Sequence, residues 1–132
     1  MLKKFLALGV ILCSVIIAGA VYLFRDSAKP QTHTVNLTED SFSPAELTIN
    51  KGDTVVFTTT RGKQFWPASN LHPTHGIYPE FDPKEPIDPD DSWSFTFIKA
   101  GKWKYHDHLA PLYRGVINVQ DKKTRSSGCK NV

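Results

Sequence analysis

Cysteine and methionine are scarce in this chain of 132 residues, which contains two cysteines and one methionine, Met1. Cys13 lies in an apolar N-terminal run and Cys129 in a polar C-terminal tail, so a disulfide between them would join a membrane segment to a tail. We therefore expect no intramolecular disulfide, and Cys129 either pairs with another chain or stays a free thiol. The chain that follows the apolar N-terminal run, about a hundred residues, is long enough to bury one hydrophobic core without a disulfide.

The chain also lacks a basic stripe, although its net charge is +3. Its positive charge gathers near the two ends, at Lys3, Lys4, Lys122, Lys123, Arg125 and Lys130. Acidic residues gather in the middle, at Glu80, Asp82, Glu85, Asp88, Asp90 and Asp91. This distribution argues against nucleic acid as a partner.

An uncharged run from Phe5 to Phe24 follows Lys3 and Lys4. It matches the length of about 20 residues that a helix needs to cross a bilayer. The segment Ala18-Gly19-Ala20 fits a signal-peptidase site, but the apolar run continues past it, which favours an uncleaved anchor over a cleaved signal peptide. A lipid anchor on Cys13 is disfavoured because the bulky Leu12 precedes it. The positive charges should stay inside, which leaves the rest of the chain outside the cytoplasm.

These patterns predict a division of the chain into four parts. Residues 1–25 are an N-terminal membrane anchor or signal peptide, 26–32 a tether, 33–120 the folded domain and 121–132 a polar tail. The predicted location is membrane-anchored with the domain outside the cytoplasm, periplasmic or at the cell surface; the alternative is secretion after signal cleavage. The membrane, reached through the N-terminal helix, is thus an expected partner.

No sustained 3.6-residue period follows residue 32, which argues against helices there. Apolar residues instead alternate with polar ones in short runs rich in aromatic and β-branched side chains. These runs lie at residues 35–37, 47–49, 55–57, 93–97, 103–105 and 116–119. Short strands separated by regular turn signals predict an all-β fold, a β-sandwich.

Residues 61–91 interrupt this rhythm with prolines at positions 67, 73, 79, 83, 86 and 89. Proline cannot serve a central strand, so we expect a long, stiff loop. Its aromatic residues argue against disorder, and a loop of this length in a small domain is usually functional.

Four of the five histidines fall into two clusters. His72 and His75 lie in the long loop, whereas His106 and His108 form an H-x-H pair at the end of an expected strand. Side chains two apart in a strand point to the same face, so this pair can offer two imidazoles to one ion. Imidazole suits copper, and zinc accepts the same ligands. We therefore predict one metal ion, copper with zinc as the alternative, bound by His72, His75, His106 and His108.

Other polar and aromatic residues near these clusters receive different interpretations. His33 has no partner in the sequence and is expected to be a surface or hydrogen-bonding residue. Asp107 should point away from the H-x-H face as a surface charge or as a group that supports a ligand from behind. Glu80 and Asp82 can ligate a metal, although a solvated loop acid is the favoured interpretation of each.

Two aromatic segments lie close to the same clusters. Trp103 and Tyr105 are expected in the core because of their strand alternation. The segment Phe65-Trp66-Pro67 either packs over the site or forms a docking patch.

The order of these motifs resembles the cupredoxin (plastocyanin-like) family over residues 33–119. F-x-P at 42–44, L-x-I at 47–49 and K-G-D-T-V-x-F at 51–57 are similar to the family's opening strands. G-x-W-x-Y-H at 101–106 and G-V-I-x-V at 115–119 are similar to its closing hairpin and metal loop. The resemblance implies a Greek-key β-sandwich with copper at one end.

The chain is an atypical member by this resemblance, because it lacks the Cys and Met copper ligands of blue-copper proteins. Counting forward from Gly101, His106 takes the Cys position; counting back from Gly115, His108 takes that of the closing His and Tyr113 that of the Met. These counts disagree by one residue, so the metal loop differs from that of the family in its length as well as in its residues. A site without thiolate predicts a non-blue, nitrogen-rich copper centre. The H-x-H segment is also similar to strand ends of multicopper oxidases, but only locally.

The resulting functional prediction is a copper-binding protein for copper capture, buffering or transfer, or for electron transfer. A redox or copper-delivery protein is then an expected partner. One alternative is a mononuclear metal oxidoreductase, although no clear general acid or base accompanies the histidines. The other is a metal-free interaction module with the same fold.

Overall fold

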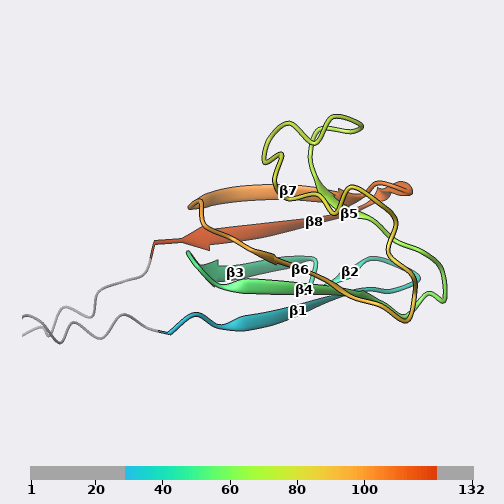
Figure 1. The fold of residues 1–132 in the computed structure, drawn as a ribbon, viewed down its shortest axis with the longest axis horizontal. Helices are drawn as coiled ribbons and strands as arrows, with labels where there is room; N and C mark the ends of the chain where they lie inside the picture. Colours follow the sequence, from blue (N-terminus) through green and yellow to red (C-terminus); the bar gives the residue numbers. More distant parts are fainter. Residues whose placement is uncertain (1–28, 122–132) are drawn as a thin grey trace, which may run out of the picture. The chain divides into compact units, whose positions relative to one another are not determined.

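The computed structural model describes residues 29–121 (Figure 1). The predicted anchor or signal segment, Cys13 and the tail with Cys129 lie outside the described residues. Within the described range, no helix is long and apolar enough to cross a membrane.

The described residues form eight strands. These are β1 (Thr32–Leu37), β2 (Phe42–Ser43), β3 (Glu46–Asn50), β4 (Thr54–Thr59), β5 (Pro67–Ser69), β6 (Trp93–Thr96), β7 (Gly101–Asp107) and β8 (Ala110–Gln120). Six of them cover the alternating runs of the sequence, because side chains at every second position reach the same face of a strand.

The strands form two four-stranded sheets, in the orders β2-β1-β4-β6 and β3-β8-β7-β5. Both sheets are mixed: β1 runs parallel to β4 and β3 parallel to β8, while the other neighbours are antiparallel. Figure 1 shows β7 and β8 toward one side of the domain and β4 and β1 toward the other, with the loop that follows β5 rising beyond β7. The predicted all-β sandwich is confirmed.

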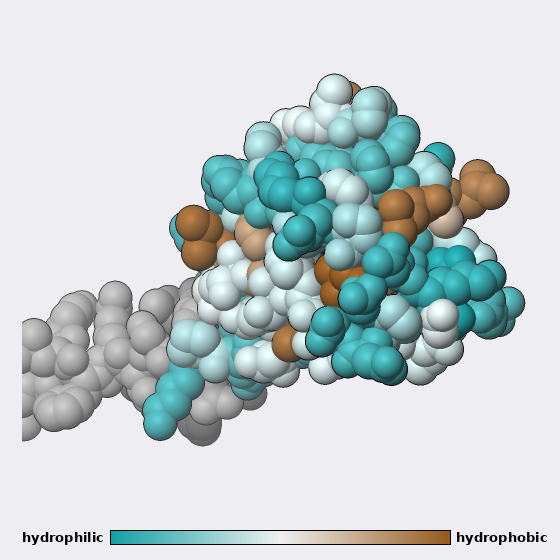
Figure 2. All heavy atoms as spheres, turned by 45° about the vertical axis from the view of Figure 1, so that its right-hand side comes forward, coloured by the Kyte–Doolittle hydropathy of each residue, from teal (hydrophilic) through white to brown (hydrophobic). Residues whose placement is uncertain are grey.

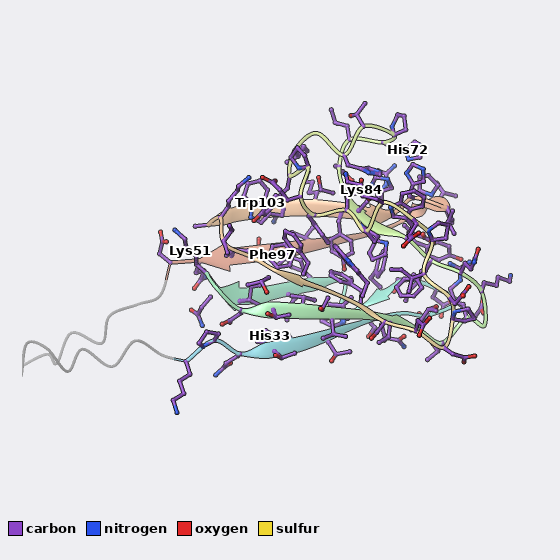
Figure 3. The ribbon with its side chains drawn as sticks, in the orientation of Figure 1. His33, Lys51, His72, Lys84, Phe97 and Trp103 are labelled. Atoms are coloured by element: carbon purple, nitrogen blue, oxygen red, sulfur yellow. The ribbon has the colours of Figure 1, made fainter. Side chains whose placement is uncertain are left out.

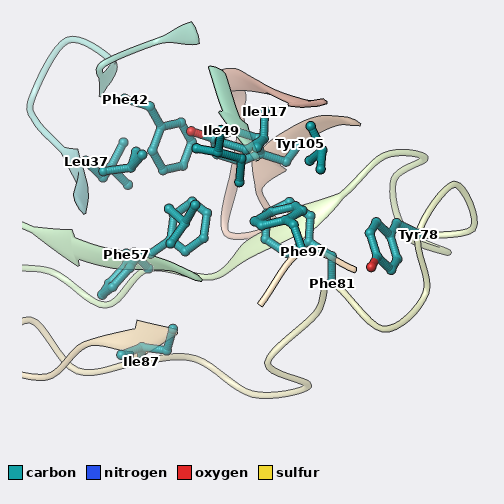
Figure 4. Packing of buried hydrophobic residues seen from close by; sticks show 14 residues of the cluster. Leu37, Phe42, Ile49, Phe57, Tyr78, Phe81, Ile87, Phe97, Tyr105 and Ile117 are labelled. Carbon is teal, nitrogen blue, oxygen red and sulfur yellow. The ribbon is translucent and has the colours of Figure 1, made fainter. Parts of the chain in front are cut away.

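Aromatic side chains fill the space between the two sheets (Figure 4). The ring of Phe57 in β4 lies 5.5 Å from that of Tyr105 in β7, so the two sheets meet at this pair. Phe81, from the long loop, lies 5.5 Å from Phe57 on another side. Each ring is fully buried, and aromatic pairs of this kind contribute about 0.5–1.5 kcal/mol beyond their burial. The prediction that Tyr105 belongs to the core is confirmed.

Gly115 in β8 pairs directly with Tyr105 in β7. A Cβ at position 115 would lie 2.3 Å from the Tyr105 hydroxyl oxygen, so only glycine fits beside this ring. Because successive side chains of a strand alternate, burying Tyr105 in the core turns His106 toward the opposite face of the sheet. The close Gly115–Tyr105 contact therefore helps to set the side on which the histidines lie.

The proline-rich segment 61–91 is not wholly a loop, which corrects the sequence interpretation. Residues Pro67–Ser69 form β5, which pairs antiparallel with β7 at the edge of its sheet. A proline is tolerated there because an edge strand leaves one side of its backbone unpaired. Just before β5, Phe65 forms an isolated antiparallel bridge with Ile87 near the other end of the segment. Both residues are buried, so the segment forms part of the core.

Candidate metal centre

The structure brings together the four histidines that the sequence singled out. His72 and His75 lie in the loop after β5, His106 lies near the end of β7, and His108 follows β7 in the turn to β8. One ring nitrogen of each lies within 4.8 Å of the others. Nδ1 of His72 is 3.2 Å from Nε2 of His106, and Nε2 of His75 is 2.9 Å from Nδ1 of His108.

The pairing of β5 with β7 places the loop above the H-x-H pair. Ala68 lies opposite His106, so the chain leaves β5 beside the strand that carries that ligand. The buried Ser69 hydroxyl then ties the loop down: it bonds the carbonyl of His75 at 3.0 Å and accepts the N–H of Tyr78 at 2.9 Å. On the β7 side, the pairing of β7 with β8 shifts its register between His106 and Asp107, and such an irregularity bends a strand locally.

His75 is held by Asp82. Nδ1 of His75 donates to Oδ2 of Asp82 at 2.6 Å, which leaves Nε2 with its lone pair facing the other imidazoles. The backbone of His75 has φ of +52°, a left-handed conformation that costs a non-glycine residue about 1–2 kcal/mol. Its ring is 4 % exposed, so packing and the Asp82 bond hold this conformation.

The Asp82 carboxylate also accepts hydrogen bonds from Nε1 of Trp66 and Nζ of Lys84, each at 2.8 Å. Burial alone would raise the pKa of Asp82, but hydrogen bonds from Lys84, His75 and Trp66 outweigh it and hold the pKa well below its usual range. The expectation of a solvated loop acid is wrong for Asp82, whose side chain is 5 % exposed. It is right for Glu80, which is exposed and paired with Lys99 at 2.9 Å.

His106 is held by Asn70. Nδ1 of His106 donates to Oδ1 of Asn70 at 2.9 Å, which turns Nε2 toward the cluster. The His106 residue is 2 % exposed, and burial, followed by the charge of the neighbouring imidazoles, lowers its pKa to about 4. Burial likewise lowers the pKa of His108. These rings are neutral near pH 7, the form in which imidazole binds a metal.

Trp66 contacts the cluster from the side. Its ring centroid lies 4.5 Å from that of His108, and its carbonyl accepts the N–H of His108 at 2.7 Å. Together with the bond to Asp82, these contacts resolve the open question on this segment: Trp66 packs at the site.

Asp107 is buried, so the surface-charge interpretation is wrong. Its carboxylate accepts the N–H groups of Trp66 at 2.9 Å and Leu109 at 3.2 Å, and it pairs with Arg61 at 3.3 Å. Asp107 thus fixes the backbone just after the H-x-H pair and, at Trp66, the neighbouring segment that leads into β5.

Two other residues of the sequence analysis lie elsewhere. His33 bonds Asp53 at 3.2 Å toward the opposite end of the sandwich from the labelled His72 (Figure 3), which confirms the hydrogen-bonding interpretation. Tyr113 donates its hydroxyl to the carbonyl of Glu39 at 2.9 Å and lies under the Arg61 guanidinium. The supporting roles of Asn70 and Asp82 were missed, and closeness to His72 and His75 in the sequence was their only signal.

Comparison with solved structures shows the fold. A reduced amicyanin variant matches 67 % of this chain and 82 % of its own length, with 23 % identity and a TM-score of 0.58. A second amicyanin variant matches 72 % and 84 %, with 24 % identity and a TM-score of 0.57. A purple cupredoxin from Nitrosopumilus maritimus matches 67 % and 99 %, with 18 % identity and a TM-score of 0.55. The fold is cupredoxin-like, as the sequence resemblance implied.

Some of the similar amicyanin structures are Cu(I) forms. Searches against known protein families and against curated proteins find no match for this chain. The cluster of four imidazoles is a donor set that can hold a metal ion.

Proposed function

We propose that this cupredoxin-like domain binds one copper ion through Nδ1 of His72, Nε2 of His75, Nε2 of His106 and Nδ1 of His108. The carrying observation is that one ring nitrogen of each of the four histidines lies within 4.8 Å of the others. Metal–imidazole bonds are about 2.0–2.1 Å long, so the nitrogen pairs 2.9 and 3.2 Å apart are each close enough for both members to bind one ion.

The donor set favours copper. Imidazole nitrogen binds copper, zinc, iron and nickel, and affinity along the divalent series peaks at copper. The likeness to amicyanin adds a fold in which copper sites occur. Zinc accepts four histidines as well, so the metal is a question for experiment.

The same donor set argues against a blue-copper centre. Between residues 14 and 128 the sequence has neither Cys nor Met, so the site can offer the ion no thiolate or thioether. We therefore expect a Cu(II) spectrum with nitrogen ligands and without an intense thiolate band. When bound, copper would supply one-electron chemistry. Asp82 and Asn70 would hold two of its ligands, His75 and His106, in their orientation.

The role that we propose is capture, buffering or transfer of copper, or electron transfer, with a copper-delivery or redox protein as partner. The apolar run after Lys3 and Lys4 supports a location at the outer face of a membrane, with the domain in the periplasm or at the cell surface. The proposed role depends on the metal site, whereas the proposed location rests on the apolar run.

The experiment is to purify the full chain, in detergent where it stays with the membrane fraction, and to load it with Cu(II) or Zn(II). We expect one copper per chain by elemental analysis and nitrogen hyperfine structure in the electron paramagnetic resonance (EPR) spectrum. His33→Ala is the matched control, because it removes an imidazole outside the cluster.

The other outcomes separate the alternatives. Zinc in place of copper would overturn the metal assignment. Absence of any metal in the natively folded chain would favour an interaction module, and turnover of a redox substrate would favour an oxidoreductase.

A further inference from the structure

The four imidazoles differ in how firmly the protein holds them. Nδ1 of His75 bonds Asp82 at 2.6 Å and Nδ1 of His106 bonds Asn70 at 2.9 Å, and both rings are buried. A hydrogen bond from the second ring nitrogen to a protein oxygen fixes the tautomer and the orientation of a histidine that binds a metal. These two ligands are thus oriented before any ion arrives.

His108 is held in another way. Its ring packs against Trp66, and its backbone N–H donates to the Trp66 carbonyl at 2.7 Å. The next residue, Leu109, donates its own N–H to the buried carboxylate of Asp107. Removing the His108 ring from the cluster would therefore break its packing contact with Trp66, beside a backbone that is held by hydrogen bonds.

His72 has none of these supports. Its side chain is exposed, and within residues 29–121 its only hydrogen bond joins Nδ1 to Nε2 of His106, which is itself a cluster nitrogen. Its ring lies 5.2 Å from the ring of His106 and 4.7 Å from that of His108. The two ends of the loop that carries His72 are joined by a backbone hydrogen bond, in which the N–H of Ile77 donates to the carbonyl of Asn70 at 2.8 Å.

The surface beside His72 is open to solvent. Leu71 is 62 % exposed, and Figure 2 shows exposed hydrophobic side chains lying among hydrophilic ones over the face that it displays. A molecule approaching from solvent thus reaches the His72 position before it reaches the buried rings of His75 and His106.

We propose that His72 is the replaceable ligand of the site, and that a neutral nitrogen donor from outside, of the imidazole class, takes its place on the ion. This inference rests on the proposed copper site. In the exchange, one copper–nitrogen bond forms to the incoming donor and the bond to Nδ1 of His72 breaks, with no change in oxidation state. His75, His106 and His108 keep the ion in the protein while a partner's histidine or a free imidazole binds.

The test compares His72→Ala with His106→Ala in the full chain. Chelator competition gives the copper affinity, and EPR reports the ligand set. His72→Ala should bind copper about 10- to 100-fold more tightly than His106→Ala, since that is the factor an oriented ligand gains from its supporting hydrogen bond. Free imidazole should restore the wild-type EPR parameters in His72→Ala and leave His33→Ala, the matched control, unchanged.

His106 is buried, so His106→Ala can fail to fold, and His106→Gln, which keeps a polar amide at that position, is the second variant. Equal copper affinities in His72→Ala and a folded His106 variant would overturn the assignment of His72. So would an EPR spectrum of His72→Ala that imidazole does not change. Failure of the wild-type chain to bind copper would instead overturn the proposed function.

Discussion

Each end of the sandwich holds a histidine bonded to a buried aspartate, and the two pairs serve different purposes (Figure 3). At one end, His75 donates to Asp82 at 2.6 Å, and its other nitrogen faces three imidazoles. At the other end, His33 bonds Asp53 at 3.2 Å, and Asp53 also accepts the backbone N–H groups of Gln31 and Asn50.

The difference lies in which member of the pair the hydrogen bond positions, the histidine in one pair and the aspartate in the other. Asp82 orients an imidazole whose second nitrogen is left free for a metal. His33 is one of three donors to a carboxylate that ties the start of β1 to the turn between β3 and β4. A histidine–carboxylate pair therefore indicates a metal site only when the far side of the ring meets further ligands.

The largest expected effect comes from removing the histidine at each end in turn. Copper at about 100 times its dissociation constant should add about 2.7 kcal/mol to the free energy of unfolding of the wild-type chain. His75→Ala should lose most of this gain, because one oriented ligand is gone, whereas His33→Ala should keep it. Denaturation with and without copper measures both, and a full gain in His75→Ala would show that His75 does not bind the ion.

Exchanging the two carboxylates for amides should give opposite patterns. Asp82→Asn should weaken copper binding by about 10- to 100-fold, because an amide cannot accept from both His75 and Trp66. Asp53→Asn should leave copper affinity unchanged but lower the metal-free stability by about 1–3 kcal/mol, since the amide nitrogen would face a partly buried backbone N–H. Chelator competition and urea titrations measure the two quantities. Similar losses of copper affinity in both variants would erase the distinction between the ends.

Much of the sandwich could be predicted because period-two alternation is a local property of the sequence. Val55 and Phe57 in β4 point inward, as their spacing indicates. The segment Pro67–Ser69 could not be recognised as a strand, because its proline is acceptable only at a sheet edge, and edge position is a property of the whole fold.

The histidines of the site could be predicted from the sequence, but the residues that hold them by hydrogen bonds could not. The H-x-H spacing of His106 and His108 follows from strand geometry, and a stiff loop with two more histidines suggested their partners. Whether Glu80 or Asp82 supports a histidine depends on how the loop folds back over β7, which no local pattern encodes. Asn70 was missed for the same reason.

Acid should reveal the role of Asp53 in stability. Burial would raise the pKa of Asp53, but the N–H groups of Gln31 and Asn50, together with His33, lower it overall. A carboxyl whose folded pKa lies below the unfolded value of about 3.9 contributes stability above that pH and loses it as the pH falls through the folded pKa. The metal-free stability of Asp53→Asn should therefore fall less steeply than that of wild type below about pH 4. Urea titrations across this range measure it, and parallel curves would contradict the assignment.

The smallest effect is expected for Lys84→Ala, although the hydrogen bond from Lys84 does most to lower the pKa of Asp82. Its Nζ lies 2.8 Å from Oδ2 of Asp82, but the Lys84 side chain is 68 % exposed, and ion pairs with an exposed partner contribute about 0–1 kcal/mol. Alanine keeps the Cβ atom, so the strain of the +70° φ at this position is unchanged and only the side-chain contact is lost.

The stability of Lys84→Ala should thus fall by less than about 1 kcal/mol, and its copper affinity should stay close to that of wild type. A loss as large as that of Asp82→Asn would mean that the lysine, and not His75 with Trp66, holds the carboxylate in place. In that case the loop acid would owe its position to a surface contact, and high salt should weaken copper binding in the wild-type chain.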